Sequence, residues 1–201
     1  MSPRRRTALV AGLFTAYLVL ALLVALHSPV DAADLALFHW TRRHRVDWLV
    51  SLCRDINDTF SPRTDVTVVA IVAAVVAWRL RSWRAIGEPA LVLVLLGIVV
   101  EGSKIAIGRP GPGDLASREL QGAYPSGHAA ALLVCGSILL LLLQLDRSRA
   151  ARLVLGGLAA LLLVTLIYAH FHFVSDIVGS WLAGAAILHA LGRRVRRAVA
   201  G

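Results

Sequence analysis

Six apolar runs, separated by short polar stretches, limit what this chain can fold into. They lie near residues 7–27, 66–80, 88–107, 127–145, 153–170 and 176–192. A helix needs about 20 residues to cross the hydrocarbon core of a membrane. The second and sixth runs are short, but Arg79 and Arg193 can extend them by reaching to the interface. Because 58% of the residues are hydrophobic and only 16% are charged, the composition excludes an ordinary soluble domain. The sequence predicts one all-α membrane domain over residues 1–201, a bundle of six transmembrane helices.

The first run follows three arginines, at residues 4–6, as the apolar core of a signal peptide would. The run is longer than the usual core of about 7–15 residues, and no small-residue cleavage site follows it clearly. We therefore expect a retained helix, with a removed signal peptide as the alternative.

The basic residues indicate an orientation. With six spans, both termini share one side, and that side carries 13 of the 21 lysines and arginines, against 8 on the other. Positive charge collects on the cytoplasmic side of membrane proteins, so we expect cytoplasmic termini in the cell membrane. The arginines sit in clusters between apolar runs, which is a topology signal and does not favour nucleic acid as a partner. In the long outer loop, apolar residues at helical spacing predict a helix lying on the membrane surface: Val46, Leu49, Val50, Cys53, Ile56 and Phe60.

Under this topology, three polar clusters meet at the outer ends of the third to sixth helices. The first contains Lys104, the only lysine, within an apolar run. A charge at that depth is costly unless it faces a polar cavity. Glu101, three residues earlier, offers the alternative of a simple internal ion pair. The turn-rich stretch GRPGPG follows and leaves Arg109 near the mouth of the site.

The second cluster is YPSGHAA, residues 124–130. Pro125 suits a first helical turn. Ser126 and Gly127 would then present N–H groups and a hydroxyl at a helix N-terminus, which is an anion-binding arrangement. His128 could give a proton to a group bound there. The alternative is an ordinary Pro-Ser helix start with an incidental histidine.

The third cluster contains His172 and Asp176, four residues apart. The carboxylate could bond one ring nitrogen and orient the other as a nucleophile. His170 falls at the same level, and the residues leave open whether it shares the site. Neither the histidines nor the two cysteines, Cys53 and Cys135, form a metal-ligand pattern.

These clusters resemble the type 2 phosphatidic acid phosphatase superfamily, which includes bacterial undecaprenyl-diphosphatases. Its pattern is Lys-x6-Arg-Pro, Pro-Ser-Gly-His and Ser-Arg-x5-His-x3-Asp; Lys104, all of Pro-Ser-Gly-His, His172 and Asp176 match. Both arginines of this pattern are missing. Gly111 stands where the arginine of Lys-x6-Arg-Pro is expected, and Leu166 stands where the arginine of Ser-Arg-x5-His is expected. We expect Arg109 and His170 to substitute for them; Arg118 could reach the site only through its loop.

The resemblance implies that His172 attacks phosphorus, Asp176 stabilises the imidazolium, and His128 protonates the leaving oxygen. The phosphate would be held by Lys104, Arg109, Ser126, Gly127 and His170. No metal or other cofactor is implied.

The expected activity is hydrolysis of a membrane lipid phosphate at the outer face, with a polyprenyl diphosphate as substrate and the lipid bilayer as surroundings. Alternatives are phosphatidic acid or phosphatidylglycerol phosphate as substrate, phosphoryl transfer to a lipid alcohol, or a non-catalytic lipid-binding protein that has lost both arginines. A transporter is disfavoured because the polar residues gather at one face. The oligomeric state does not follow from the sequence.

Overall fold

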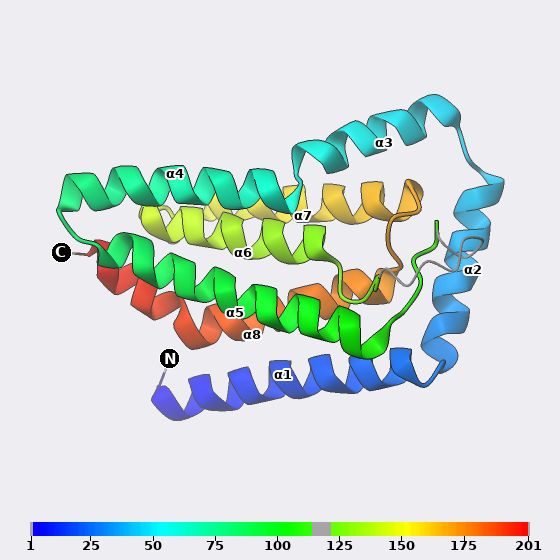
Figure 1. Ribbon diagram of the computed structural model, residues 1–201, viewed down its shortest axis with the longest axis horizontal. Helices are drawn as coiled ribbons and strands as arrows, with labels where there is room; N and C mark the ends of the chain where they lie inside the picture. Colours follow the sequence, from blue (N-terminus) through cyan, green and yellow to red (C-terminus); the bar gives the residue numbers. More distant parts are fainter. Residues whose placement is uncertain (1, 114–121, 201) are drawn as a thin grey trace.

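The computed structural model describes residues 2–113 and 122–200, and the regular structure in those residues is helical. The helices follow one another along the chain in this order: α1 (Pro3–Ala25), α2 (Pro29–Arg43), α3 (Asp47–Thr59), α4 (Pro62–Leu80), α5 (Arg84–Ile107), α6 (Gly127–Leu142), α7 (Arg149–Tyr168) and α8 (Val174–Val199). Helices α1, α4, α5, α6, α7 and α8 run along the length of the molecule, and α2 crosses one end of them (Figure 1). The predicted all-α bundle is confirmed.

Helix α8 is the centre of the bundle. It packs against α1, α5 and α6, and its buried face carries small residues that include Gly179, Ser180, Ala183 and Gly184. Small side chains let helix backbones approach closely, which is how helices associate where the surroundings are as apolar as the side chains. Gly179 is needed for this reason, since it faces the ring of Tyr124 in the segment before α6.

Three helices begin with the same dipeptide, Ser-Pro. Ser2, Ser28 and Ser61 each cap a helix by accepting a backbone N–H from the first turn, and a proline follows at the first helical position. A serine cap satisfies an N–H that has no partner within the helix, and proline suits that position because it lacks an N–H. These caps explain why α4 begins at Pro62, four residues before the expected span.

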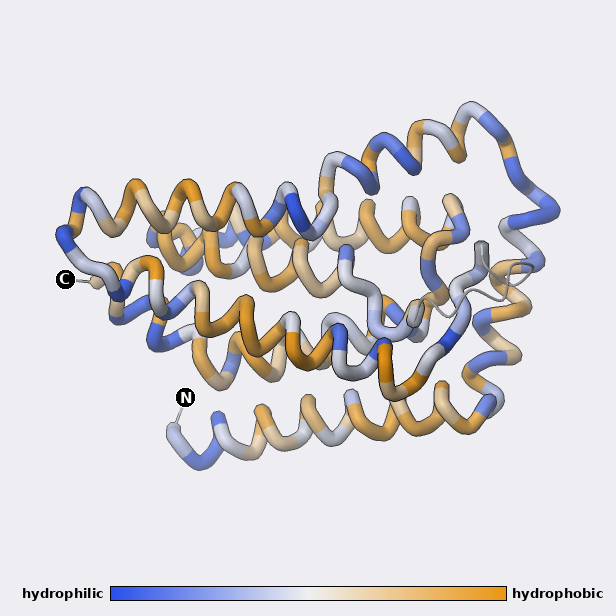
Figure 2. The backbone as a smooth tube through the Cα atoms, viewed as in Figure 1, coloured by the Kyte–Doolittle hydropathy of each residue, from blue (hydrophilic) through white to orange (hydrophobic). Residues whose placement is uncertain are grey.

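Five stretches are long and apolar enough to cross a membrane. Four of them are the helices α1, α5, α7 and α8, and the fifth is Asp47–Leu80, which includes α4. Large apolar side chains on these helices point outward, among them Leu18, Leu22, Ile71 and Ile98. Figure 2 shows hydrophobic residues along the middle of the bundle and hydrophilic ones mainly toward its ends. This is a multi-pass membrane protein. Helix α6 has only 16 residues, so the count of six spans stays a prediction.

Two ion pairs join α8 to its neighbours at one end of the bundle. Arg194 of α8 pairs with Glu88 of α5 at 2.7 Å, and Arg196 pairs with Asp146 after α6. The opposite end holds α2, α3, the described residues 108–113 and 122–126 that flank α5 and α6, and the α7–α8 connection (Figure 1).

The long loop contains two helices, one more than expected. Helix α3 matches the predicted amphipathic segment, and its buried residues Val50 and Cys53 lie on the side that packs against α7. The Thr165 hydroxyl of α7 donates to Asn57 Oδ1 of α3 at 2.7 Å. Helix α2 was not expected, although its Ser-Pro start and the basic residues of its last turn are helix signals.

Candidate active site

The three polar clusters converge on one cavity at the end of the bundle near α2. The cavity has a volume of about 540 Å³, and its lining includes Lys104, Gly127, His128 and His172. Helix α5 contributes Lys104, the first turn of α6 contributes Gly127 and His128, and the α7–α8 connection contributes His172. Lys104 and His172, 68 positions apart in the sequence (172 − 104), thus line one pocket.

Main-chain hydrogen bonds join the second cluster to the third. The Ser126 N–H donates to the carbonyl of Asp176 at 3.1 Å. The Ser180 hydroxyl, which is fully buried, lies 2.7 Å from the carbonyl of Ser126 and 2.8 Å from that of Asp176. These contacts fix the start of α6 against the first turn of α8. The relative position of His128 and His172 therefore depends on rigid, buried backbone.

The start of α6 differs from the expectation in one respect. Pro125 precedes the helix, after a cis peptide bond with Tyr124, and Ser126 is the N-cap. The Ser126 hydroxyl accepts the Ala129 N–H at 3.3 Å, and the residue is fully buried. The Ser126 hydroxyl is thus engaged in capping α6. The N–H groups of Gly127 and His128 belong to the first turn, where no intrahelical acceptor is available.

Lys104 lies beside this helix start. A Cβ atom added to Gly127 would be 3.7 Å from the Lys104 Nζ, so glycine lets the ammonium group approach the N-terminus of α6. Glu101 accepts a hydrogen bond from Nζ at 2.9 Å, and both side chains are partly exposed. The expected ion pair therefore exists, and it leaves Lys104 at the wall of the cavity.

The two histidines face each other across the cavity. Their ring centroids are 6.3 Å apart, and the rings are inclined by 61°. His172 Nδ1 lies 3.5 Å from Asp176 Oδ2, in contact with the carboxylate but without the geometry of a hydrogen bond. The same Oδ2 accepts the Phe173 N–H at 2.9 Å. The expected pair is thus brought together, with the His172 Nδ1 buried beside the carboxylate that would hold its proton.

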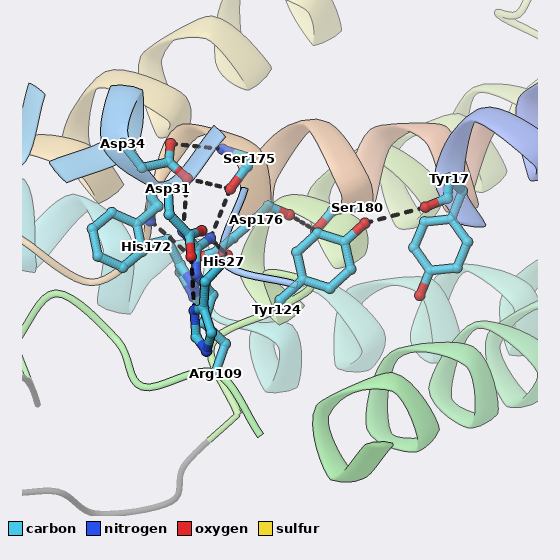
Figure 3. A network of polar contacts seen from close by, with 11 residues as sticks. Tyr17, His27, Asp31, Asp34, Arg109, Tyr124, His172, Ser175, Asp176 and Ser180 are labelled. Atoms are coloured by element: carbon cyan, nitrogen blue, oxygen red, sulfur yellow. Dashed lines mark hydrogen bonds and ion pairs between the residues drawn. The ribbon is translucent and has the colours of Figure 1, made fainter. Parts of the chain in front are cut away.

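Arg109 lies in a buried network on the far side of Asp176 (Figure 3). Its Nη1 donates to Asp176 Oδ1 at 2.6 Å and to the Ser175 hydroxyl at 2.7 Å. Its Nη2 donates to Asp31 and Asp34 of α2, each at 2.8 Å. Burial disfavours the charged guanidinium, but Asp176 and Asp34 outweigh this effect and raise the pKa of Arg109.

Arg109 was expected to bind phosphate in place of the missing first arginine. The structure instead places its guanidinium among three carboxylates and against the Phe173 ring, 4.3 Å from the ring centre. It is absent from the described lining of the 540 Å³ cavity. Sequence reasoning missed Asp31 and Asp34, which stand three residues apart in the first two turns of α2.

His170 faces a different cavity. Helix α7 ends at Tyr168, and His170 takes a left-handed conformation with φ of 60°, so its ring does not continue the face of Leu166. Its Nε2 is 3.1 Å from the Thr41 hydroxyl, which itself donates to the Phe38 carbonyl. Burial and the nearby arginines 45, 42 and 54 lower the pKa of His170. The lowered pKa disfavours the charged imidazolium, so His170 is a poor replacement for a permanently charged arginine.

Leu166, which stands in place of the second missing arginine, lies in the hydrophobic core. Leu166 is fully buried, and it packs with Leu162 of α7, Ile177 of α8 and Leu132 of α6. Arg118 lies outside the described residues. Within the described part of the chain, no group of three histidine, cysteine or carboxylate side chains is arranged to hold a metal ion.

Two histidines, a carboxylate and a lysine around one end cavity of an apolar helix bundle are the kinds of group that suit reactions of phosphate groups at a membrane. The family model named PAP2 superfamily matches residues 85–199. The chain belongs to this family, as the resemblance of its motifs predicts, and it is a membrane phosphatase of the PAP2 type.

The fold agrees with this assignment. A solved structure described as the first transmembrane PAP2 type phosphatidylglycerolphosphate phosphatase from Bacillus subtilis superimposes with a TM-score of 0.75. The two chains are 22% identical, and the match covers 92% of this chain and 94% of that one. Among curated proteins, no relative matches the sequence.

Proposed function

We propose that this protein hydrolyses a lipid phosphate through a phosphohistidine formed on His172. The observation that carries the proposal is the pair His128 and His172, which face each other across one cavity with Lys104 and the N-terminus of α6 at its wall. A nucleophile, a proton donor and cations around one phosphate are what phosphoryl transfer needs.

In the first step, His172 Nε2 attacks phosphorus while Nδ1 keeps its proton beside Asp176. The bond from phosphorus to the lipid oxygen breaks, and His128 gives that oxygen a proton. Lys104 and the N–H groups of Gly127 and His128 offset the charge that spreads over the phosphoryl oxygens. In the second step, His128 takes a proton from water, the water oxygen attacks phosphorus, and the bond from phosphorus to Nε2 breaks to release phosphate.

The proposed substrate is a polyprenyl diphosphate. The second candidate is phosphatidylglycerol phosphate, and the similar solved structure favours it, because that protein is described as a phosphatidylglycerolphosphate phosphatase. The two candidates differ in the lipid tail and in the link between their two phosphate groups. The phosphates are joined directly in the diphosphate and through a glycerol in phosphatidylglycerol phosphate. The substrate is identified by measuring kcat/KM for both lipids and for the monophosphate counterpart of each. The lipid with the highest kcat/KM is the preferred substrate.

The chemistry is tested by substituting the two histidines. His172→Ala should abolish both turnover and the phosphoenzyme, whereas His128→Ala should slow turnover and still allow some phosphohistidine to be trapped. Vanadate, which mimics five-coordinate phosphorus, should inhibit the enzyme. His189→Ala is the matched control, since His189 lies on α8 near the opposite end of the bundle. A His172→Ala variant with wild-type activity would refute the mechanism.

We further propose that the site faces the outside of the cell membrane. The distribution of 13 basic residues against 8 supports this orientation. Single cysteines at Gly113, beside the site, and at Arg149, at the start of α7, are both exposed positions near opposite ends. In a background without Cys53 and Cys135, an impermeant maleimide added to intact cells should label only the first. If only the cysteine at position 149 were labelled, the orientation would be the opposite of the one proposed.

A further inference from the structure

A second, larger cavity adjoins the first at the same end of the bundle. Its volume is about 780 Å³. Its lining comes from α2, α3, the connection between them, residues 112–113 and the α7–α8 connection. The lining residues are Phe38, His39, Arg42, Arg45, Arg54, Pro112, Gly113, Ala169, His170 and Phe171. The mechanism proposed above uses none of these residues.

Three arginines from different parts of the chain converge on this second cavity. Arg42 comes from the last turn of α2, Arg45 from the α2–α3 connection and Arg54 from α3. Arg45 pairs with Asp47 at 3.2 Å, whereas neither Arg42 nor Arg54 has an ion-pair or hydrogen-bond partner in the described part of the chain. The positive fields of all three overlap at His170, whose pKa they lower together with burial.

The walls of the second cavity strengthen this field. Phe38, Ala169 and Phe171 are apolar, and the described lining contains no carboxylate. A concave site with low-dielectric walls and charges of one sign concentrates counter-ions. Guanidinium groups in particular bind phosphate oxygens through paired, charge-assisted hydrogen bonds. The chemistry of the lining therefore fits a phosphate group.

The two cavities share a wall. Phe171 lines both of them, and consecutive residues of one turn divide between them: Gly111 lines the first, and Pro112 and Gly113 line the second. His172 and His170 stand on either side of Phe171 in the sequence and open into the first and the second cavity, respectively. A phosphate attacked by His172 would thus lie close to any anion held by the three arginines.

The first cavity has little positive charge of its own. Lys104 is the one basic side chain of fixed charge in its described lining, and Glu101 is already bound to it. A lipid with two phosphate groups would bring more negative charge than that lysine can offset. The second cavity supplies the missing cations at a neighbouring position.

We propose that the arginine-lined cavity binds a second phosphate group of the lipid substrate while the first one reacts at His172. This proposal rests on the proposed phosphatase function and specifies its substrate class: lipids that carry two phosphate groups, either directly linked or separated by a glycerol. Arg42, Arg45 and Arg54 then act as specificity-determining residues.

The test compares matched lipids that differ by the second phosphate. Farnesyl phosphate is paired with farnesyl diphosphate, and phosphatidic acid with phosphatidylglycerol phosphate, all in neutral detergent micelles. The wild type should prefer the two-phosphate member of at least one pair by about tenfold or more, the scale of one or two charge-assisted hydrogen bonds. Arg42→Gln with Arg54→Gln should lower kcat/KM for that member at least tenfold more than for its monophosphate partner. Arg43→Gln, the neighbouring exposed arginine outside the described lining, should leave the preference intact.

Several results would overturn the proposal. One is a wild type with no preference in either pair, and another is a double variant that loses activity equally on both members. If the arginines affected turnover only after phosphatidylglycerol was added to the micelles, the ligand would be the head group of a neighbouring lipid. If the double variant mainly relieved inhibition by orthophosphate, the ligand would be the released product. If any of these results were found while His172→Ala was inactive, the proposed phosphatase function would stand. Only the proposed second phosphate site would be rejected.

Discussion

Arg109 and Asp176 form a buried ion pair, with 2.6 Å between Nη1 and Oδ1. The other nitrogen of the same guanidinium binds Asp31 and Asp34 of α2. One arginine thus connects the carboxylate beside His172 to the helix that crosses the end of the bundle. The Ser175 N–H and hydroxyl both donate to Asp34, and the Phe173 N–H donates to Asp176, so these two carboxylates are held by neutral donors as well as by the guanidinium. We infer that Arg109 positions Asp176.

The first prediction concerns this network. Arg109→Ala would leave three carboxylates near one another without their cation, and breaking a buried ion pair in this way costs about 3–5 kcal/mol. We expect a large fall in Tm together with a loss of kcat. Arg109→Lys should restore only part of both, because an ammonium group cannot bridge the carboxylates as a planar guanidinium does.

Arg194→Ala is the control for this prediction, because Arg194 forms an exposed pair with Glu88. Such pairs contribute about 1 kcal/mol or less, so its Tm should stay near that of the wild type. The measurements are thermal unfolding in detergent and steady-state kinetics. If Arg109→Ala reduced catalysis while its Tm stayed unchanged, the arginine would act on the substrate rather than on the fold.

The second prediction concerns the family arginine that this chain lacks. Leu166→Arg would restore the pattern in the sequence, but the side chain would enter a core in which Leu166 is fully buried among leucines and isoleucine. Burying an unpaired charge is strongly unfavourable. We expect the variant to lose stability and to gain no activity. Leu166→Met, which conserves volume, should cost less than about 1.5 kcal/mol. A stable Leu166→Arg variant with higher kcat/KM would show that the side chain can reach the phosphate.

The sequence predicted those parts of the site whose positions follow from helix ends. Lys104, His128 and His172 lie near the ends of apolar runs, so the number and direction of the helices bring them together. The partners of Arg109 could not be predicted in this way, because Asp31 and Asp34 lie in a helix that the apolar pattern did not reveal. His170 was misplaced for a local reason: two residues after α7 ends, its backbone becomes left-handed, and the helical spacing from Leu166 no longer applies.

The third prediction separates a phosphate-binding role of Lys104 from a simple ion pair with Glu101. If Lys104 stabilises the phosphoryl oxygens, Lys104→Met should lower kcat/KM by about a hundredfold or more, the scale of losing one donor to the transition state. Glu101→Gln should change it little or raise it slightly, because the substrate would no longer compete with a carboxylate. If the pair were only structural, both variants would lose stability alike and activity in proportion.

The last prediction concerns the glycine that lets α8 meet the segment before α6. A Cβ atom at Gly179 would lie 2.5 Å from the hydroxyl oxygen and 2.6 Å from two ring carbons of Tyr124, which is fully buried. Gly179→Ala must therefore displace Tyr124, and Ser126, two residues later, caps the helix that carries His128. We expect a loss of about 1–3 kcal/mol, the usual cost of overpacking, together with a lower kcat.

Gly156→Ala is the matched control for this substitution, since a Cβ atom there would meet nothing within 4 Å and alanine favours a helix over glycine. It should leave both stability and kcat at or above the wild-type values. Thermal unfolding and kinetics of Gly179→Ala, Tyr124→Leu and the double variant complete the test as a double-mutant cycle. Because the smaller side chain makes room for the methyl group, Gly179→Ala should cost little stability in the Tyr124→Leu background. Equal costs in both backgrounds would mean that the contact with Tyr124 does not require glycine at this position.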